Sequence, residues 1–118
     1  MLFRSPLFET ETRTLDLSDG TTVNGLVFTG WNGSGSTLTV PSAYNWSAVL
    51  GLDAGFFADA QSTQSLTIPS TVLWLDPSAS YAGTITADTD SAAYAWAQTH
   101  AADVRPILYT LTLDANLG

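Results

Sequence analysis

Acid–base or nucleophilic chemistry would have to come from very few side chains in this sequence. His100 is the only histidine, and there is no cysteine. A catalytic triad would need His100, because such work requires a base that titrates near neutrality beside a nucleophile. No pattern around His100 supports a triad. We interpret it as a structural histidine at a helix end, hydrogen-bonded to a carbonyl group or to solvent.

Paired carboxylates are the other route to catalysis. Asp53 and Asp59 bracket Phe56 and Phe57, an arrangement similar to the acid pair and aromatic platform of a glycosidase. Acids near loops more often cap turns or face solvent, and 118 residues leave little scaffold for a substrate cleft. We therefore expect no catalytic residues and predict that the protein is not an enzyme.

Hard oxygen ligands for calcium occur at two places, Asp88 with Asp90 and Asp16 with Asp19. Neither place has the longer series of acids, the glycine and the terminal glutamate of an EF-hand loop. Capping of a following helix explains Asp88 or Asp90 more simply. We predict no metal site and no cofactor.

The charge balance restricts the partners. Eleven acidic residues face Arg4, Arg13 and Arg105 with no lysine, which gives a formal net charge of -8. Three scattered arginines cannot neutralise a row of phosphates, so we expect neither nucleic acid nor an anionic membrane surface as partner. No apolar run approaches the roughly 18 residues of a membrane span, and Pro6 and Glu9 interrupt any signal-peptide core.

The elements that must position these side chains are mostly short strands. Alternating runs rich in Thr, Val, Ile, Leu and aromatic residues are separated by Gly, Asn, Asp, Ser and Pro, which is typical of strands joined by turns. Their spacing predicts a mainly β fold, a small β-sandwich or barrel of about seven short strands. The runs are residues 13–17, 21–29, 37–40, 66–68, 71–75, 81–87 and 107–113.

Three segments depart from this pattern. Residues 91–103 are alanine-rich, follow capping candidates and place Trp96 and His100 at helical spacing, which predicts one helix there. Residues 43–61 mix both periodicities, and we favour strand. Residues 29–36 contain three glycines and predict a loop.

Trp31 is placed within this glycine-rich loop. A large aromatic side chain on a loop either inserts into a partner or folds back onto the core. We favour packing on the core and keep Trp31 as a candidate partner-binding residue. Trp74 and Trp96 are expected in the core, whereas the position of Trp46 is ambiguous.

Residues 1–12 predict an extended N-terminal arm in front of a single β-rich domain, residues 13–118. Pro6 opposes a helix, and no turn signal folds the arm back. The arm could be an edge strand of its own domain, or it could add a strand to the sheet of a neighbouring subunit. Its apolar residues and its one cation, which could pair with a partner carboxylate, are candidate partner contacts: Leu2, Phe3, Arg4, Leu7 and Phe8.

The apolar arm, the cysteine-free β domain with one helix, and the acidic composition rich in Ser, Thr, Ala and Gly together resemble virion proteins of tailed bacteriophages, particularly head decoration (cement) proteins. The resemblance is architectural and covers the whole chain without a diagnostic motif. It implies a non-enzymatic protein of the virion, assembled in the host cytoplasm, that docks on major capsid protein. It also implies a homo-oligomer, with a trimer favoured, whose arm contacts the capsid.

Two alternatives stay open. A tail-tube, connector or fibre subunit of the same kind of particle would share this composition. A carbohydrate-binding or adhesin-like β module could use Trp31, Trp46, Phe56 and Phe57 as stacking platforms for sugar rings.

Overall fold

The computed structural model describes residues 7–17 and 19–107. The mainly β fold class is confirmed: this part of the chain forms nine strands and two helices. In chain order they are β1 (Phe8–Asp16), β2 (Thr22–Trp31), β3 (Thr37–Thr39), β4 (Ala43–Tyr44), β5 (Ser47–Leu52), α1 (Ala54–Ala60), β6 (Ser65–Thr67), β7 (Trp74–Leu75), β8 (Tyr81–Ala87), α2 (Ala92–His100) and β9 (Ala101–Pro106).

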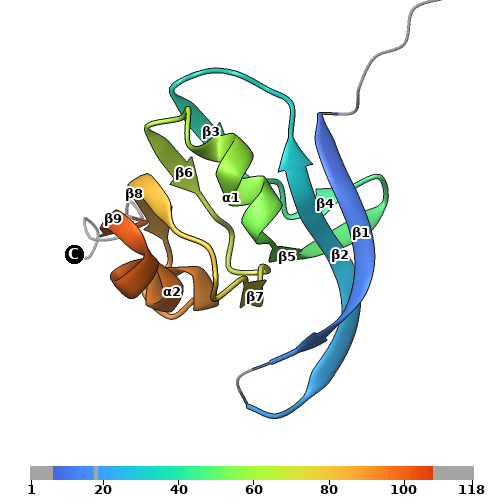
Figure 1. Cartoon of the computed structure of the whole chain (residues 1–118). Coiled ribbons are helices and arrows are strands. Elements are labelled where there is room, and N and C mark those ends of the chain that lie inside the picture. The colour runs from blue at the N-terminus through green and yellow to red at the C-terminus, as the bar shows by residue number, and fades with distance from the viewer. Residues whose placement is uncertain (1–6, 18, 108–118) are drawn as a thin grey trace, which may run out of the picture.

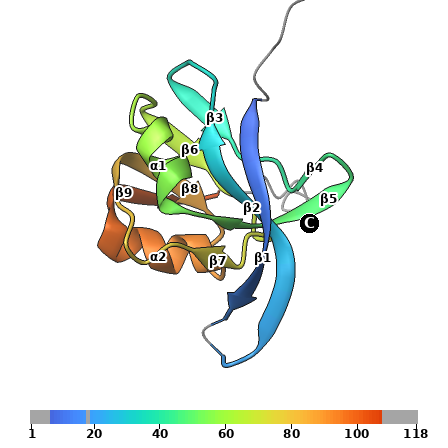
Figure 2. The ribbon, with the colours of Figure 1, turned by 45° about the vertical axis from the view of Figure 1, so that its right-hand side comes forward.

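The strands form two sheets (Figures 1 and 2). The first has the order β1-β2-β5-β4, with β7 also paired to β5, and mixes antiparallel and parallel neighbours. The second has the order β3-β6-β8-β9, and all its neighbours are parallel. Helix α1 contacts β2 of the first sheet and β8 of the second, so it joins the two layers.

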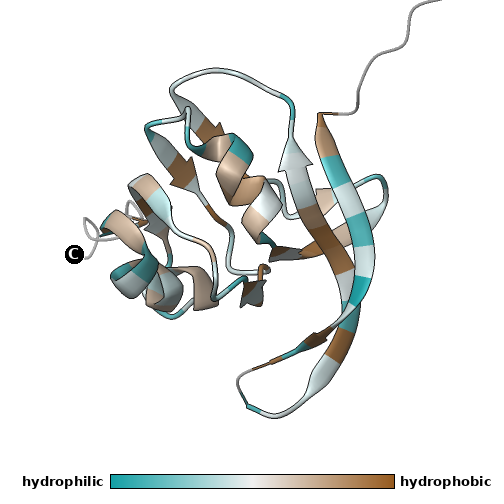
Figure 3. Ribbon diagram, in the orientation of Figure 1, coloured by the Kyte–Doolittle hydropathy of each residue, from teal (hydrophilic) through white to brown (hydrophobic). Residues whose placement is uncertain are grey.

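The core lies between these layers. Its largest fully buried side chains come from both sheets and from α1, and Figure 3 shows apolar residues along the strands that face α1. Each such side chain contributes about 1.5–3 kcal/mol relative to an exposed one. The fully buried side chains of greatest volume are Phe28, Phe56, Phe57, Leu52, Leu66, Ile68 and Ile85.

Helix α1 corrects the expectation of strand throughout residues 43–61. The first part of that segment does form β4 and β5, but Ala54–Ala60 is helical. The carboxylate of Asp53 caps the helix by accepting a hydrogen bond from the Phe56 backbone N–H at 3.1 Å. Phe56, Phe57 and Ala60 are buried on one face of it. A capping aspartate and a short apolar face therefore decide this helix.

Helix α2 begins as predicted but ends three residues early, at His100 rather than near residue 103. Its cap differs from expectation: the side chain of Ser91, and not that of Asp88 or Asp90, accepts a hydrogen bond from the Tyr94 backbone N–H at 3.2 Å. Ala101 is already extended, and the following residues pair with β8 as β9. Pairing with a buried strand overrides the local helical preference of alanine. The predicted strand 107–113 lies outside the described residues except for Ile107.

Two boundaries near the N-terminus also differ from expectation. Strand β1 starts at Phe8, so the sheet begins before residue 13, and residues 8–12 follow the alternative of an edge strand of the chain's own domain. Strand β2 runs to Trp31, which shortens the predicted loop of residues 29–36 at its start. In both cases the pairing of β1 with β2 extends further than the local sequence pattern indicates. Neither helix of the described chain is long and apolar enough to cross a membrane.

Candidate partner-binding site

Strand β1 lies at the edge of the first sheet. It pairs with β2 along all nine of its residues, and no other strand in residues 7–17 and 19–107 pairs with it. On the outer side of an edge strand, alternate backbone N–H and C=O groups are left for water or for another strand. We call this outer edge, together with Leu7, the β1 surface.

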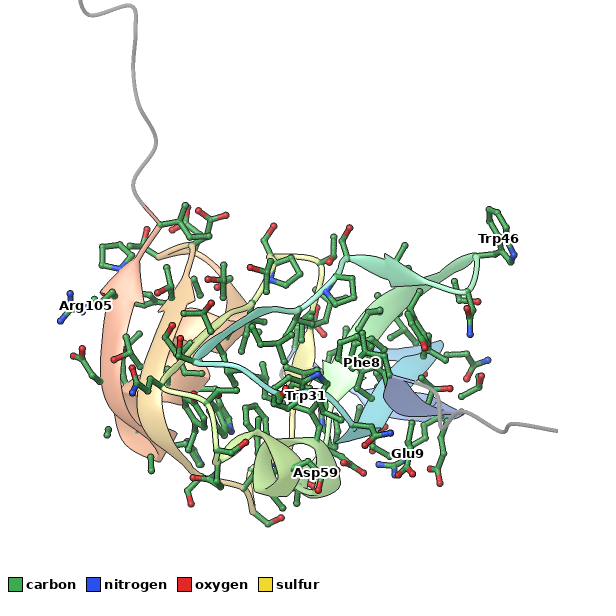
Figure 4. The ribbon with its side chains drawn as sticks, turned by 90° about the horizontal axis from the view of Figure 1, so that it is seen from above. Phe8, Glu9, Trp31, Trp46, Asp59 and Arg105 are labelled. Carbon is green, nitrogen blue, oxygen red and sulfur yellow. The ribbon has the colours of Figure 1, made fainter. Side chains whose placement is uncertain are left out.

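Phe8 anchors the start of β1 in the core. Its ring is 4% exposed, stacks on Phe28 with centroids 4.1 Å apart, and meets Tyr44 edge-on at 5.3 Å. Figure 4 shows Phe8 inside the molecule. The prediction that Phe8 contacts a partner is therefore wrong, because intramolecular aromatic packing already covers the ring.

Leu7 stands in contrast to its neighbour. Its side chain is 49% exposed, while its backbone carbonyl accepts a hydrogen bond from the Asn32 N–H at 2.8 Å. The backbone is thus held at the end of the sheet and the side chain remains free for contact. Leu2, Phe3 and Arg4, the other predicted contacts, lie outside the described residues.

Trp31 packs on the core, as we favoured, and the prediction that it contacts a partner is wrong. The residue is 7% exposed, and its backbone N–H donates to Asp59 at 2.9 Å. Gly33 follows closely over the indole ring: a Cβ atom at this position would lie 2.5 Å from the indole nitrogen. The indole N–H is buried and donates to no group of the described chain.

Charged groups flank the β1 surface. Arg13 donates to Glu11 at 2.7 Å and to Asp53 at 2.9 Å, which ties β1 to the cap of α1. Hydrogen bonding to Glu11, and then to Asp53, raises the pKa of Arg13 against the opposing effect of burial. Charges on an edge strand discourage indiscriminate pairing with other strands. A partner strand would therefore have to match this pattern of charges.

The residues considered for catalysis have structural roles. The His100 ring stacks on Trp96, with centroids 4.9 Å apart. Its Nδ1 atom lies 2.9 Å from the carbonyl oxygen of Trp96, and its Nε2 atom lies 3.1 Å from that of Pro77. The interpretation as a helix-end histidine bonded to carbonyl groups is confirmed.

The acid pair does not flank an aromatic platform. Asp53 caps α1, and Asp59 holds the backbone of Trp31. Phe56 and Phe57 are buried in the core. Nowhere in the described ranges do three or more His, Asp or Glu side chains gather as a metal site would require.

Trp46 is the one proposed sugar platform that lies on the surface. It occupies the tip of the β4–β5 hairpin, is fully exposed, and points away from the body of the molecule (Figure 4). Elsewhere, a surface groove of about 350 Å³ lies between the end of β1, β7 and α2. We call it the α2 groove. Its lining is mainly apolar and includes Leu17, Leu73, Trp74, Ala92 and Ala95.

Comparison of the chain with protein-family models, with curated proteins and with solved structures found no match.

Proposed function

We propose that this protein is a non-enzymatic subunit of a larger protein assembly and that it joins its partner through the β1 surface. One observation carries the proposal: a nine-residue edge strand, paired on one side only by the described strands, directly follows the half-exposed Leu7. An extended segment can add to such an edge, with backbone hydrogen bonds supplying affinity and alternate side chains supplying register.

The contacts divide between two kinds of residue. Leu7 supplies exposed apolar surface at the point where the chain enters the sheet. Leu2, Phe3 and Arg4 precede it in sequence and remain proposed contacts, with Arg4 suited to pairing with a partner carboxylate. Phe8, buried directly after Leu7, fixes the position of the backbone at the start of β1.

We further propose, from the architectural resemblance, that the assembly is the virion of a tailed bacteriophage and that the partner is major capsid protein. The subunit would decorate the head, as a trimer, without a cofactor. A tail-tube, connector or fibre position is the alternative within the same kind of particle. The carbohydrate-binding alternative loses three of its four proposed platforms, because Trp31, Phe56 and Phe57 are buried.

The test uses phage heads purified from particles in which the gene for this chain has been deleted. We expect the purified full chain to co-sediment with these heads and to appear on their outer surface by electron cryo-microscopy. Leu7→Asp places a charge in the proposed interface and should reduce the bound fraction at least tenfold. Ala102→Asp adds the same charge at an exposed position of β9 and should bind as the unmodified chain does.

Two results would count against the proposal. Heads that bind none of the unmodified chain would remove the capsid as partner. Equal binding of the Leu7→Asp and Ala102→Asp variants would remove the β1 surface as the point of contact. Circular dichroism of both variants should match the unmodified chain, since both side chains are exposed.

A further inference from the structure

The β4–β5 hairpin presents Trp46 in an uncommon backbone conformation. Tyr44 pairs with Ser47, so the turn consists of Asn45 and Trp46 alone. Their φ angles are 51° and 69°, the left-handed values of a type I′ turn. Glycine normally occupies the second position, since a bulky side chain there is strained. Strain retained at an exposed aromatic residue points to a use of that side chain.

Nothing within the described molecule covers this side chain. Trp46 is 102% exposed, the largest value among its exposed large apolar residues. A two-residue turn also holds the backbone of Trp46 in one conformation, which lowers the entropic cost of using the ring in an interface. Tryptophan is among the residue types that are enriched at the centres of such contacts.

The α2 groove offers a matching receptor on the same chain. Leu73, 43% exposed, and Trp74 line it beside Ala95 of α2. Its volume of about 350 Å³ lies within the range of pockets that enclose ligand groups. Asp16 also lines the groove and supplies a carboxylate that can accept the N–H of an inserted indole ring.

The geometry points to a contact between two copies of this chain, in which Trp46 of one copy inserts into the α2 groove of the next. Trp46 is not among the residues that line the groove. It projects at the end of the molecule opposite Arg105 of β9 (Figure 4), whereas the groove includes α2, which packs against β9. The ring thus projects away from the body of the chain that carries it.

Such a contact is heterologous, because the two copies contribute different surfaces. Repetition of a heterologous contact gives a closed ring if the rotation closes and a filament if it does not. The trimer proposed above would be one closed ring of this kind. Each copy carries a formal charge of -8, so repulsion opposes association and added salt should strengthen it.

Analytical ultracentrifugation of the full chain tests the contact. The unmodified chain should increase in mass with concentration, up to about 1 mM, as a weak contact centred on one buried aromatic side chain requires. Trp46→Ser removes the inserted side chain, and Leu73→Asp blocks the groove. Each variant alone should remain monomeric. An equimolar mixture should form a 1:1 dimer, because one variant retains the groove and the other retains the tryptophan.

Three results would overturn the inference: an unmodified chain that is monomeric throughout this range, self-association of Trp46→Ser, or a mixture that stays monomeric. Leu7→Ser is the matched control, since it removes another exposed apolar side chain and should leave self-association unchanged. The control also separates this contact from the proposed docking at the β1 surface. If the experiment disproves the contact through Trp46, the proposed docking at the β1 surface still stands, and the reverse also holds.

Discussion

Neighbouring residues of similar type have opposite roles at the start of β1. Leu7 is half exposed, whereas Phe8 is enclosed by the rings of Phe28, Tyr44 and Phe56. Successive side chains of a strand point to opposite faces, so one residue must face the core when its neighbour does not. We therefore expect partner contacts only from side chains on the same face of the sheet as Leu7.

Trp46 allows the strain at a single residue to be measured. Left-handed backbone costs a non-glycine residue about 1–2 kcal/mol. Trp46→Gly should therefore raise the free energy of unfolding by about 1 kcal/mol, the strain being partly offset by the greater freedom of glycine in the unfolded chain. Urea denaturation measures the change.

Trp46→Ala is the control for this measurement. Alanine removes the same exposed ring but keeps a Cβ atom in the left-handed conformation, so its stability should stay close to that of the unmodified chain. Equal stabilisation by glycine and alanine would show that the ring, and not the backbone conformation, carries the cost.

The positions of single aromatic residues could be predicted only in part from the sequence. Packing of Trp31 on the core follows from its large apolar area, and the structure confirms it. The burial of Phe8 could not be deduced, because an apolar residue in an extended segment has the same pattern whether its own sheet or a partner covers it. Only the pairing of Phe8 with Trp31 across β1 and β2 resolves the two cases.

At the scale of elements, local signals locate the starts of helices better than their ends. Asp53 and Ser91 both cap helices through their side chains, and residues of these types are common caps, although Asp88 or Asp90 was expected in place of Ser91. Helix α1 was nevertheless missed, since its seven residues span too few turns for a periodic pattern. The end of α2 is set by the pairing of β9 with β8, a contact that no local pattern contains.

The carboxylate of Asp76 connects the start of α1 to the loop that follows β7. Its hydrogen bonds give a prediction for the effect of pH on stability. Burial opposes ionisation of its carboxylate. Hydrogen bonds from the Ser78 hydroxyl at 2.7 Å, the Ser78 N–H at 2.9 Å and the Ala54 N–H at 3.2 Å outweigh that effect. The pKa of Asp76 is consequently lowered from 3.8.

A carboxylate with a depressed pKa in the folded state adds stability above its unfolded value, and this stability is lost as the pH falls through the folded value. We therefore expect the unmodified chain to be more stable than Asp76→Asn at pH 6. The difference should shrink as the pH falls below about 4. Denaturation midpoints at several pH values give the difference. Asp90→Asn, at an exposed position, controls for the loss of one charge. A stability difference between the unmodified chain and Asp76→Asn that grew at acid pH would contradict a lowered pKa of Asp76.

For the whole molecule, the sequence predicts the fold class but not the layout of the sheets. Alternating residues show which face of a strand is buried, but they do not show the neighbour or its direction. Residues 66–68 and 81–87 were both expected as strands, and β6 and β8 do form there. These two strands pair in parallel because the chain between β6 and β8 returns to the end of the second sheet at which β6 began.

Two deletions separate the N-terminal segment from the domain. Removing residues 1–11 takes away Phe8 and the first half of β1, so the loss of stability should exceed the about 3–5 kcal/mol of a buried phenylalanine alone. Removing residues 1–6 leaves β1 complete. Under the proposed function, this shorter deletion should change the free energy of unfolding by less than about 0.5 kcal/mol and should still lower binding to the purified heads at least tenfold. Undiminished binding by the shorter form would confine the interface to the β1 edge and Leu7, and it would exclude Leu2, Phe3 and Arg4 as contacts.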